Sequence, residues 1–461
     1  MACNNSDMFS PMHEALLVPI VSYLPFKEAA RTCTLSKQWK DVWKCTKSIE
    51  FNELFFVKYG DDSDDETRKA QRRVFLNFIT HWIRNYQEKV VNKFSLKVSA
   101  PENILDVVER CVAFATQHAT KELGLDFSDP KWEETDFEIH DALFELPNHV
   151  YGTASIELLK LYSCTFSLSK LLNFKALKDV SLGWIELRID TVKILLFTCN
   201  TIENLSLKKC WNLDHFDLSD KKLGLRRLVI DKCHFDCDYL AFSAPNLKFL
   251  KYSGLVGGFD IDIQQDVMEE AEIDFALMFE FDEFGNELYT LLEHLYSVRK
   301  LTVDSFLLQV IQNGDETMRI QCGLNVRHLT MKTQLHPQEL CGIRFLLFSS
   351  PMLEKLTFEI DPQIILPDYK PPYDVDLKNF WHGPQIIYRC LIKTLKVVEV
   401  NKFRGTMDEL CALFYLIKVG NVLEKMIISV EKDEHVERHC TLARTLLPVP
   451  PASKKLEISI K

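Results

Sequence analysis

A short leucine pattern recurs along this chain at a nearly regular spacing, and it restricts the possible folds more than any other feature. Each copy resembles Leu-x-x-Leu-x-Leu, with other aliphatic residues at some positions. The clearest copies cover residues 158–164, 202–210, 225–233, 247–252, 298–303, 326–331 and 353–358. Successive middle leucines, such as Leu205, Leu228 and Leu250, stand about 22 to 28 residues apart, which is the range of leucine-rich repeats.

Alternation within each copy predicts a β-strand whose leucines face a core and whose intervening residues, such as Tyr162, Lys208 and Lys251, face outward. One such unit cannot cover its own apolar edges, so neighbouring units must stack. The sequence therefore predicts an α/β fold, in which a solenoid of parallel strands is backed by helices or irregular turns.

Cysteines follow several of these strands. The chain has 14 cysteines, and they are spread along its length without a signal peptide, which argues against a disulfide framework. We expect Cys164, Cys210 and Cys233 to be small buried residues at the turn after each strand. Cys233 and His234 with Cys237 could suggest zinc, but a fourth ligand at a fitting spacing is missing.

The first 46 residues differ from the repeats and predict three short helices. The first helix would carry an apolar stripe of Leu16, Leu17, Ile20 and Leu24, and would end at Pro25. The second would run from about Lys27 to Thr32. The third would begin at Ser36 and hold Trp39 and Trp43 on one face. So small a segment must dock, either as a cap on the first strands of this chain or on another protein.

These residues resemble an F-box. The resemblance is carried by Leu24-Pro25, Leu35-Ser36-Lys37, Trp39 and Trp43, and Ala29-Ala30-Arg31-Thr32 is similar to the Ala-Val-Arg-Thr of plant F-box proteins. It implies docking on the Skp-type adaptor of an SCF ubiquitin ligase, and through the adaptor on cullin and RING subunits. The positions that the resemblance assigns to the adaptor are Met12, His13, Leu16, Leu17, Ile20, Leu24, Pro25, Leu35, Trp39 and Trp43.

Two departures from the family pattern weaken this expectation. The family opens with Leu-Pro, where this chain has Met12-His13. Pro19 falls inside the first helix, where proline costs about 3 kcal/mol. Either the helix begins near Ala15, so that Pro19 lies in its first turns, or it kinks. Adaptor binding would then be weaker than usual, or absent.

Acidic segments flank the early and middle repeats. Residues 61–66 lack the spacing of a calcium loop and predict a solvated loop before a helix over 67–86, whose buried side would hold Val74, Phe75, Phe78, Ile79 and Trp82. Acidic residues also crowd 260–283, where a degenerate strand at 269–275 and a helix at 287–295 are expected. This region is either an acidic edge that keeps a strand soluble or a patch that selects a basic target.

The C-terminal part resembles the FBD domain of plant F-box proteins. A proline-rich segment at 361–373 precedes a predicted strand at 390–400, a helix at 407–419 and a strand at 422–429. The matching residues are Trp381, Phe403-Arg404-Gly405, Glu409-Leu410 and Leu423-Glu424-Lys425-Met426. We expect this unit to close the end of the solenoid, followed by an exposed helix that carries His435 and His439. The predicted domains are an F-box at 9–46, the solenoid at 47–365, and the FBD domain with a C-terminal cap at 373–461.

Composition narrows the possible functions. The net charge of −11 argues against general nucleic-acid binding, and no apolar stretch approaches the roughly 20 residues that span a bilayer. The chain lacks phosphate-binding glycine loops and a nucleophile elbow, so we expect neither an enzyme nor a cofactor. We expect a soluble protein of the nucleus or cytoplasm.

The leading hypothesis is a substrate receptor with an unknown target protein. The alternatives are a repeat protein that no longer engages the ligase and a small-molecule receptor with a deep pocket.

Overall fold

The structure is a computed structural model that describes residues 13–59, 65–132, 144–167, 170, 174–235, 239–264, 267–275, 284–311, 323–362, 364–366, 381 and 388–461. It divides into two units, Met1–Asn212 and Leu213–Lys461, and each is described by itself. Met12 and Cys237 lie outside the described residues.

The first unit begins with a helical head and continues as strands with helices between them. The head consists of α1 (Glu14–Ser22), α2 (Phe26–Arg31) and 3₁₀ turns at Thr32–Thr34, Lys37–Trp39 and Val42–Cys45. Parallel strands follow, in the spatial order β1 (Ser48–Asn52), β2 (Lys93–Lys97), β3 (Glu122–Asp126), β5 (Leu158–Tyr162), β7 (Asp179–Gly183) and β8 (Asn204–Lys208). Between them lie α3 (Asp65–Asn85), α4 (Leu105–Gln117), α6 (Ile189–Thr198) and the short pair β4 (Phe144–Glu145) and β6 (Cys164–Thr165).

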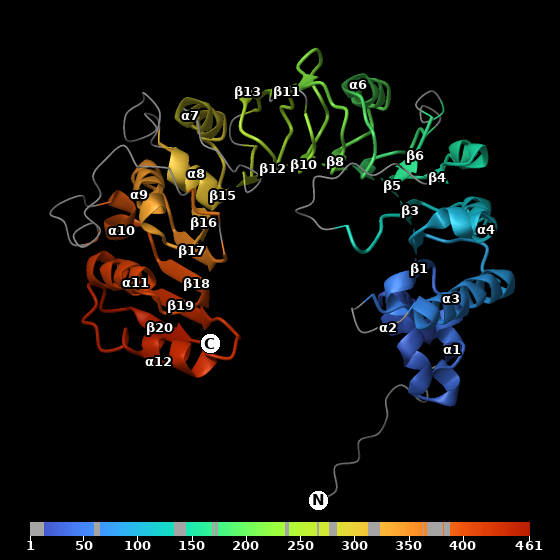
Figure 1. The fold of residues 1–461 in the computed structure, drawn as a ribbon, viewed down its shortest axis with the longest axis horizontal. Coiled ribbons are helices and arrows are strands. Elements are labelled where there is room, and N and C mark those ends of the chain that lie inside the picture. The colour runs from blue at the N-terminus through green and yellow to red at the C-terminus, as the bar shows by residue number, and fades with distance from the viewer. Residues whose placement is uncertain are drawn as a thin grey trace, which may run out of the picture. The chain divides into compact units, whose positions relative to one another are not determined.

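The second unit continues the same repeating architecture. Its parallel strands are β10 (Arg227–Asp231), β12 (Phe249–Ser253), β14 (Glu270–Asp274), β15 (Lys300–Val303), β16 (His328–Thr333), β17 (Lys355–Ile360), β18 (Val397–Phe403), β19 (Lys425–Val430) and β20 (Glu457–Ile460). Its helices are α7 (Gly285–His294), α8 (Ser305–Val310), α9 (Leu340–Ser349), α10 (Arg389–Lys393), α11 (Met407–Val419) and α12 (Val436–Arg444). Figure 1 shows α9, α10 and α11 along one side of these strands.

Side chains alternate along the strands as the leucine pattern predicts. In β5 and β8 buried leucines alternate with half-buried residues, among them Tyr162 and Lys208. Lys251 likewise lies between the buried Leu250 and Tyr252 of β12. We call the face that carries the half-buried residues the open face. The predicted α/β solenoid of parallel strands is therefore confirmed.

A left-handed residue ends several strands and explains the cysteines that follow. Ser163 and Lys209 both have φ of 53°, a backbone region that few residues other than glycine adopt. The Ser163 N–H still continues the ladder by donating to the Gly183 carbonyl at 2.9 Å. The next residue then turns into the core, so Cys164 and Cys210 are almost completely buried, as predicted.

A second layer of strands backs part of the second unit. β9 (Phe216–Leu218), β11 (Tyr239–Ser243) and β13 (Gly258–Asp262) form a separate parallel three-stranded sheet, and Figure 1 shows β11 and β13 in a layer apart from β10 and β12. Asp260 and Asp262 of the predicted acidic region are exposed on this backing sheet, whereas Glu270 and Asp274 lie on β14. The acidic residues are therefore divided between two layers. The predicted strand at 269–275 is confirmed as β14.

Three local predictions were wrong. The third head helix is two separate 3₁₀ turns: the Ser36 side chain makes no capping hydrogen bond, and Asp41, between the turns, has φ of −115° and ψ of −8°. Val74 is 61% exposed because it projects from a different side of α3 than the buried Phe75, Ile79 and Trp82.

The third error concerns the segment predicted as a strand at 390–400. It begins as the helix α10, and the strand itself is Val397–Phe403. The predicted helix at 407–419 is confirmed as α11. The strand predicted at 422–429 is β19, which begins at Lys425 and ends at Val430.

Glu339 is the residue directly before α9, and its side chain is completely buried. Its Oε2 accepts hydrogen bonds from Thr333 Oγ1 at 2.8 Å and from the backbone N–H groups of Gln334 at 3.2 Å and His336 at 2.6 Å. These donors favour the carboxylate, but burial outweighs them and raises the pKa of Glu339 to about 7.

This raised pKa makes stability depend on pH. Between pH 4.5, the ordinary pKa of the group, and about 7, folded Glu339 holds its proton more firmly than the unfolded chain does. The contribution of Glu339 to the free energy of unfolding is therefore largest below pH 4.5 and is lost as the pH rises toward 7. We expect Glu339→Gln to flatten this decline, as measured by urea unfolding across that range. A slope identical to that of the wild type would contradict the assignment.

The described residues contain neither a helix long and apolar enough to cross a membrane nor a cluster of three His, Cys, Asp or Glu side chains that could hold a metal ion. The helix predicted to carry His439 is α12, whose residues are mostly exposed or half-buried, but the His439 side chain itself is 7% exposed. Its Nδ1 lies 2.7 Å from the Arg404 carbonyl and its Nε2 lies 3.1 Å from Asp433 Oδ1, so it joins α12 to the turn after β18.

Candidate functional site

The helical head has a hydrophobic core of its own. Leu17 and Val21, four residues apart on α1, pack with Ala29, Trp39 and Val42, and all five side chains are buried. Leu24 and Trp43 are partly buried against this cluster. The aliphatic residues of α1 thus divide into two faces, and the head uses only one of them to fold.

The other face of α1 is apolar and open to solvent. Leu16 is 56% exposed, Ile20 is 36% exposed, and Tyr23, just after the helix, is 90% exposed. Their spacing of i, i+4 and i+7 places them in one stripe, which we call the α1 stripe. Leu35, after the turn Thr32–Thr34, is a further exposed leucine of the head at 67%. Large apolar side chains that gather on a small surface mark a site of protein contact.

The remaining candidates surround this stripe or support it. Leu17 and Trp39 are buried inside the head, so they hold its shape. His13 and Pro25 are exposed. Pro19 is exposed within α1, which begins at Glu14 and continues through the proline to Ser22.

Phe26 fixes the head to the first repeat. This side chain is 5% exposed, and its ring centroid lies 5.9 Å from that of Trp43, 5.7 Å from that of Phe51 in β1 and 5.7 Å from that of Trp82 in α3. All three contacts are edge-to-face, an arrangement that aromatic pairs favour. Sequence reasoning missed Phe26, although a large aromatic residue directly after Pro25 and at the start of a helix was a usable signal.

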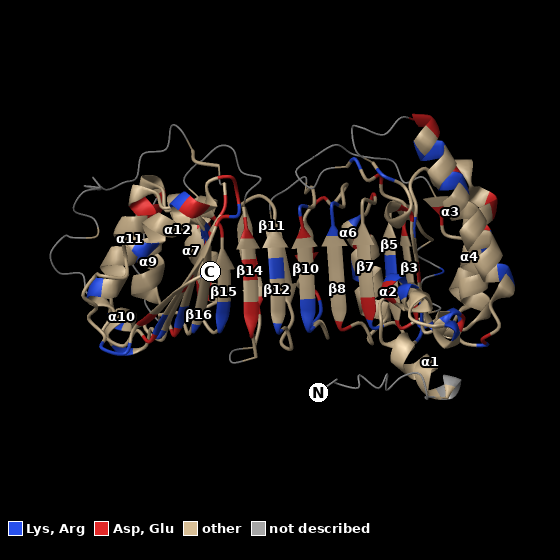
Figure 2. Cartoon of the chain, turned by 90° about the horizontal axis from the view of Figure 1, so that it is seen from below, with Lys and Arg blue, Asp and Glu red and all other residues tan. Residues whose placement is uncertain are grey.

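The open face of the strands is a second candidate surface. In the second unit its charges are mostly matched: Lys251 lies 3.3 Å from Asp231, Lys332 lies 2.8 Å from Asp274, and Lys355 lies 2.7 Å from Glu399. Figure 2 shows this mixture as blue and red segments on neighbouring strands. Of the three acidic residues on the open face of β14, Glu270 and Asp274 are paired with lysines.

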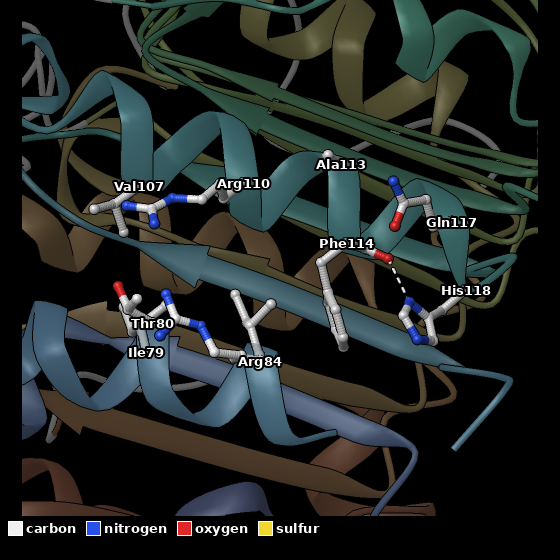
Figure 3. A pocket seen from close by; sticks show the side chains of 10 residues that line it. Ile79, Thr80, Arg84, Val107, Arg110, Ala113, Phe114, Gln117 and His118 are labelled. Atoms are coloured by element: carbon white, nitrogen blue, oxygen red, sulfur yellow. Dashed lines mark hydrogen bonds between the residues drawn. The ribbon is translucent and has the colours of Figure 1, made fainter. Parts of the chain in front are cut away.

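A groove of about 360 Å³ lies between α3 and α4. Figure 3 shows Ile79, Thr80 and Arg84 on α3 facing Val107, Arg110 and Phe114 on α4. Arg110 is paired with Asp106 at 2.7 Å, and His118 Nδ1 lies 2.7 Å from the Phe114 carbonyl. This groove lies between helices and not on the open face of the strands.

Known proteins resemble this chain over most of its length. The family described as "At1g61320/AtMIF1, LRR domain" matches residues 83–441. The chain is 31% identical to "F-box protein At3g62230" of Arabidopsis thaliana over 91% of this chain and 90% of that protein. It is also 31% identical to "Putative F-box/LRR-repeat protein At1g56400" of the same plant, over 90% of this chain and 86% of that protein. A weaker relative, "F-box/FBD/LRR-repeat protein At2g04230" of Arabidopsis thaliana, is 24% identical over 93% of this chain and 90% of that protein.

Proposed function

Because this chain belongs to the plant F-box/LRR-repeat proteins, we propose that it is the substrate-recognition subunit of an SCF-type ubiquitin ligase. The head binds the Skp-type adaptor, and the open face of the strands binds a target protein. Other subunits of the ligase carry out the transfer of ubiquitin. The chain itself is then not an enzyme: it brings the target close to the reacting subunits and orients it there.

The observation that carries this proposal is the α1 stripe. The head completes its own core with Leu17, Val21 and Trp39, yet Leu16, Ile20 and Tyr23 remain outside that core on one side of the same short helix. A stripe with this spacing fits an apolar groove on a partner protein. His13, Leu24, Pro25, Leu35 and Trp43 are assigned to the same proposed surface, and the family pattern adds Met12, which lies outside the described residues.

The direct test is co-purification. The full chain is co-expressed with a plant Skp-type adaptor, and the mixture is analysed by size-exclusion chromatography with light scattering. We expect a complex containing one copy of each protein, and addition of the cullin should shift this complex to higher mass. Separate elution of the two proteins at micromolar concentration would contradict adaptor binding.

The second candidate function is a repeat protein that no longer engages the ligase. Pro19 inside α1 and the exposed His13 before it favour this candidate, since both depart from the family pattern. It predicts that the wild-type chain elutes alone. It also predicts that the combined changes Met12→Leu, His13→Pro and Pro19→Ala recover the complex.

A further inference from the structure

One lysine on the open face of the first unit lacks the pairing that its counterparts have. Lys160 is the third residue of β5, the position that Lys251 has in β12. Lys251 pairs with Asp231, whereas none of the ion pairs or hydrogen bonds among the described residues involves the Lys160 ammonium. Lys160 is also half-buried. Partial burial of a charge without a counter-ion costs free energy, so binding of an anion beside Lys160 would be stabilising.

The ammonium group of Lys160 lies over the aromatic ring of Tyr162. Lys160 Nζ is 4.4 Å from the centroid of the Tyr162 ring, a cation–π contact. The Tyr162 hydroxyl lies 3.2 Å from Ser181 Oγ on the neighbouring strand. The ring also lies over Gly183, where an added Cβ would come within 2.9 Å of it. Tyr162 is therefore held flat against the sheet with Lys160 above it.

The carboxyl group with the strongest effect on Lys160, that of Asp126, is already engaged. Asp126, on the neighbouring strand β3, accepts from Lys97 Nζ at 2.9 Å and from Ser128 Oγ at 2.5 Å, and it is 8% exposed. Burial lowers the pKa of Lys160; Asp126 opposes this effect, while Lys97, Lys208 and Lys93 add to it. The charged groups that shift the pKa of Lys160 are thus one carboxylate, which Lys97 already pairs, and three lysines.

Small residues leave room beside Lys160. In register with it on the two adjacent strands are Gly124 and Ser181, and beyond them lie Ser95 on β2 and Ser206 on β8. A group approaching the middle of this face meets short side chains on both sides and an ammonium between them.

We propose that Lys160, above Tyr162, binds an anionic side chain of the target protein, either a carboxylate or a phosphate. The ammonium group donates charge-assisted hydrogen bonds to the anion, and the bound anion supplies the negative charge with which Lys160 forms an ion pair. This inference rests on the proposed function, because it names the chemistry by which the open face recognises its target.

The test uses the full chain and pools of random dodecapeptides. The pools are identical except for a fixed central residue, which is serine, aspartate or phosphoserine, and retention on the immobilised protein is quantified by mass spectrometry. We expect the aspartate pool, the phosphoserine pool or both to be retained at least about tenfold more than the serine pool. The pool that is preferred identifies the anion as a carboxylate or a phosphate.

Substitutions locate the site. Lys160→Met should abolish the preference, Lys160→Arg should keep it, and Lys251→Met, which removes a paired lysine from the same strand position, should leave it unchanged. Thermal unfolding of each variant verifies that it is folded. Equal retention of all pools, no retention of any, or an undiminished preference in Lys160→Met would overturn the proposal. Adaptor binding is measured on the same preparations, so a failure of the ligase hypothesis is seen separately from a failure of the anion site.

Discussion

Changing both Leu16 and Ile20 to aspartate is expected to weaken binding of a Skp-type adaptor by at least about 100-fold, since central apolar anchors each contribute about 2 kcal/mol or more to an interface. Leu16 is 56% exposed and Ile20 36%, and neither belongs to the buried core of the head. Aspartates at these positions remain hydrated in the free chain. In the complex they would be desolvated without partners. Titration calorimetry with the purified adaptor measures the loss.

Val74→Asp is the matched control for this double variant. Val74 is 61% exposed on α3, in the same unit but outside the head, so aspartate there should leave adaptor affinity unchanged. Circular dichroism of both variants checks that the helices remain. If the double variant bound the adaptor within about threefold of the wild type, the α1 stripe would not be the docking surface.

Phe26→Ala is expected to destabilise the head by about 3–5 kcal/mol, the usual cost of truncating a buried phenylalanine. The truncation removes three edge-to-face contacts at once and opens a cavity among Trp43, Phe51 and Trp82. The loss should appear as faster amide hydrogen exchange in α1 and α2, while strands far from the cavity, such as β7 and β8, keep their protection. Adaptor affinity should fall as well, because the folded head is less populated.

A suitable control for the packing effect is Phe348→Ala. Phe348 lies on α9 and is 41% exposed, so its truncation should cost much less than that of Phe26. If the exchange rates of α1 and α2 were the same in Phe26→Ala as in the wild type, the head would not depend on this aromatic anchor.

The repeats were predictable from the sequence because alternation alone determines which side of a strand faces the core. Leu205 and Leu207 must point inward if the strand is to bury anything, and Lys208 then lies on the open face. Stacking of units follows from the same need. The helix α11 was equally visible, since Thr406 caps it and Glu409 stands three residues later.

The head was harder because its apolar residues serve two purposes. Leu16 and Leu17 are adjacent and equally apolar, yet one is exposed and the other is buried. Only the packing of α1 against Trp39 and Val42 decides between them. The strands β9, β11 and β13 were missed because they lack the Leu-x-x-Leu-x-Leu pattern of the main strands, although β11 and β13 are as long as β5 and β8. The buried His439 depends on the Arg404 carbonyl, 35 residues away in the sequence, which no local pattern reveals.

The central claim is that the head folds on its own core and offers the α1 stripe to the adaptor. Hydrogen–deuterium exchange of the full chain, with and without a Skp-type adaptor, tests this claim most directly. We predict that the adaptor slows exchange in Glu14–Ser22 and around Leu35, while β10 and β12 are unaffected. Slowed exchange confined to the strands, or none in α1 at saturating adaptor, would contradict it.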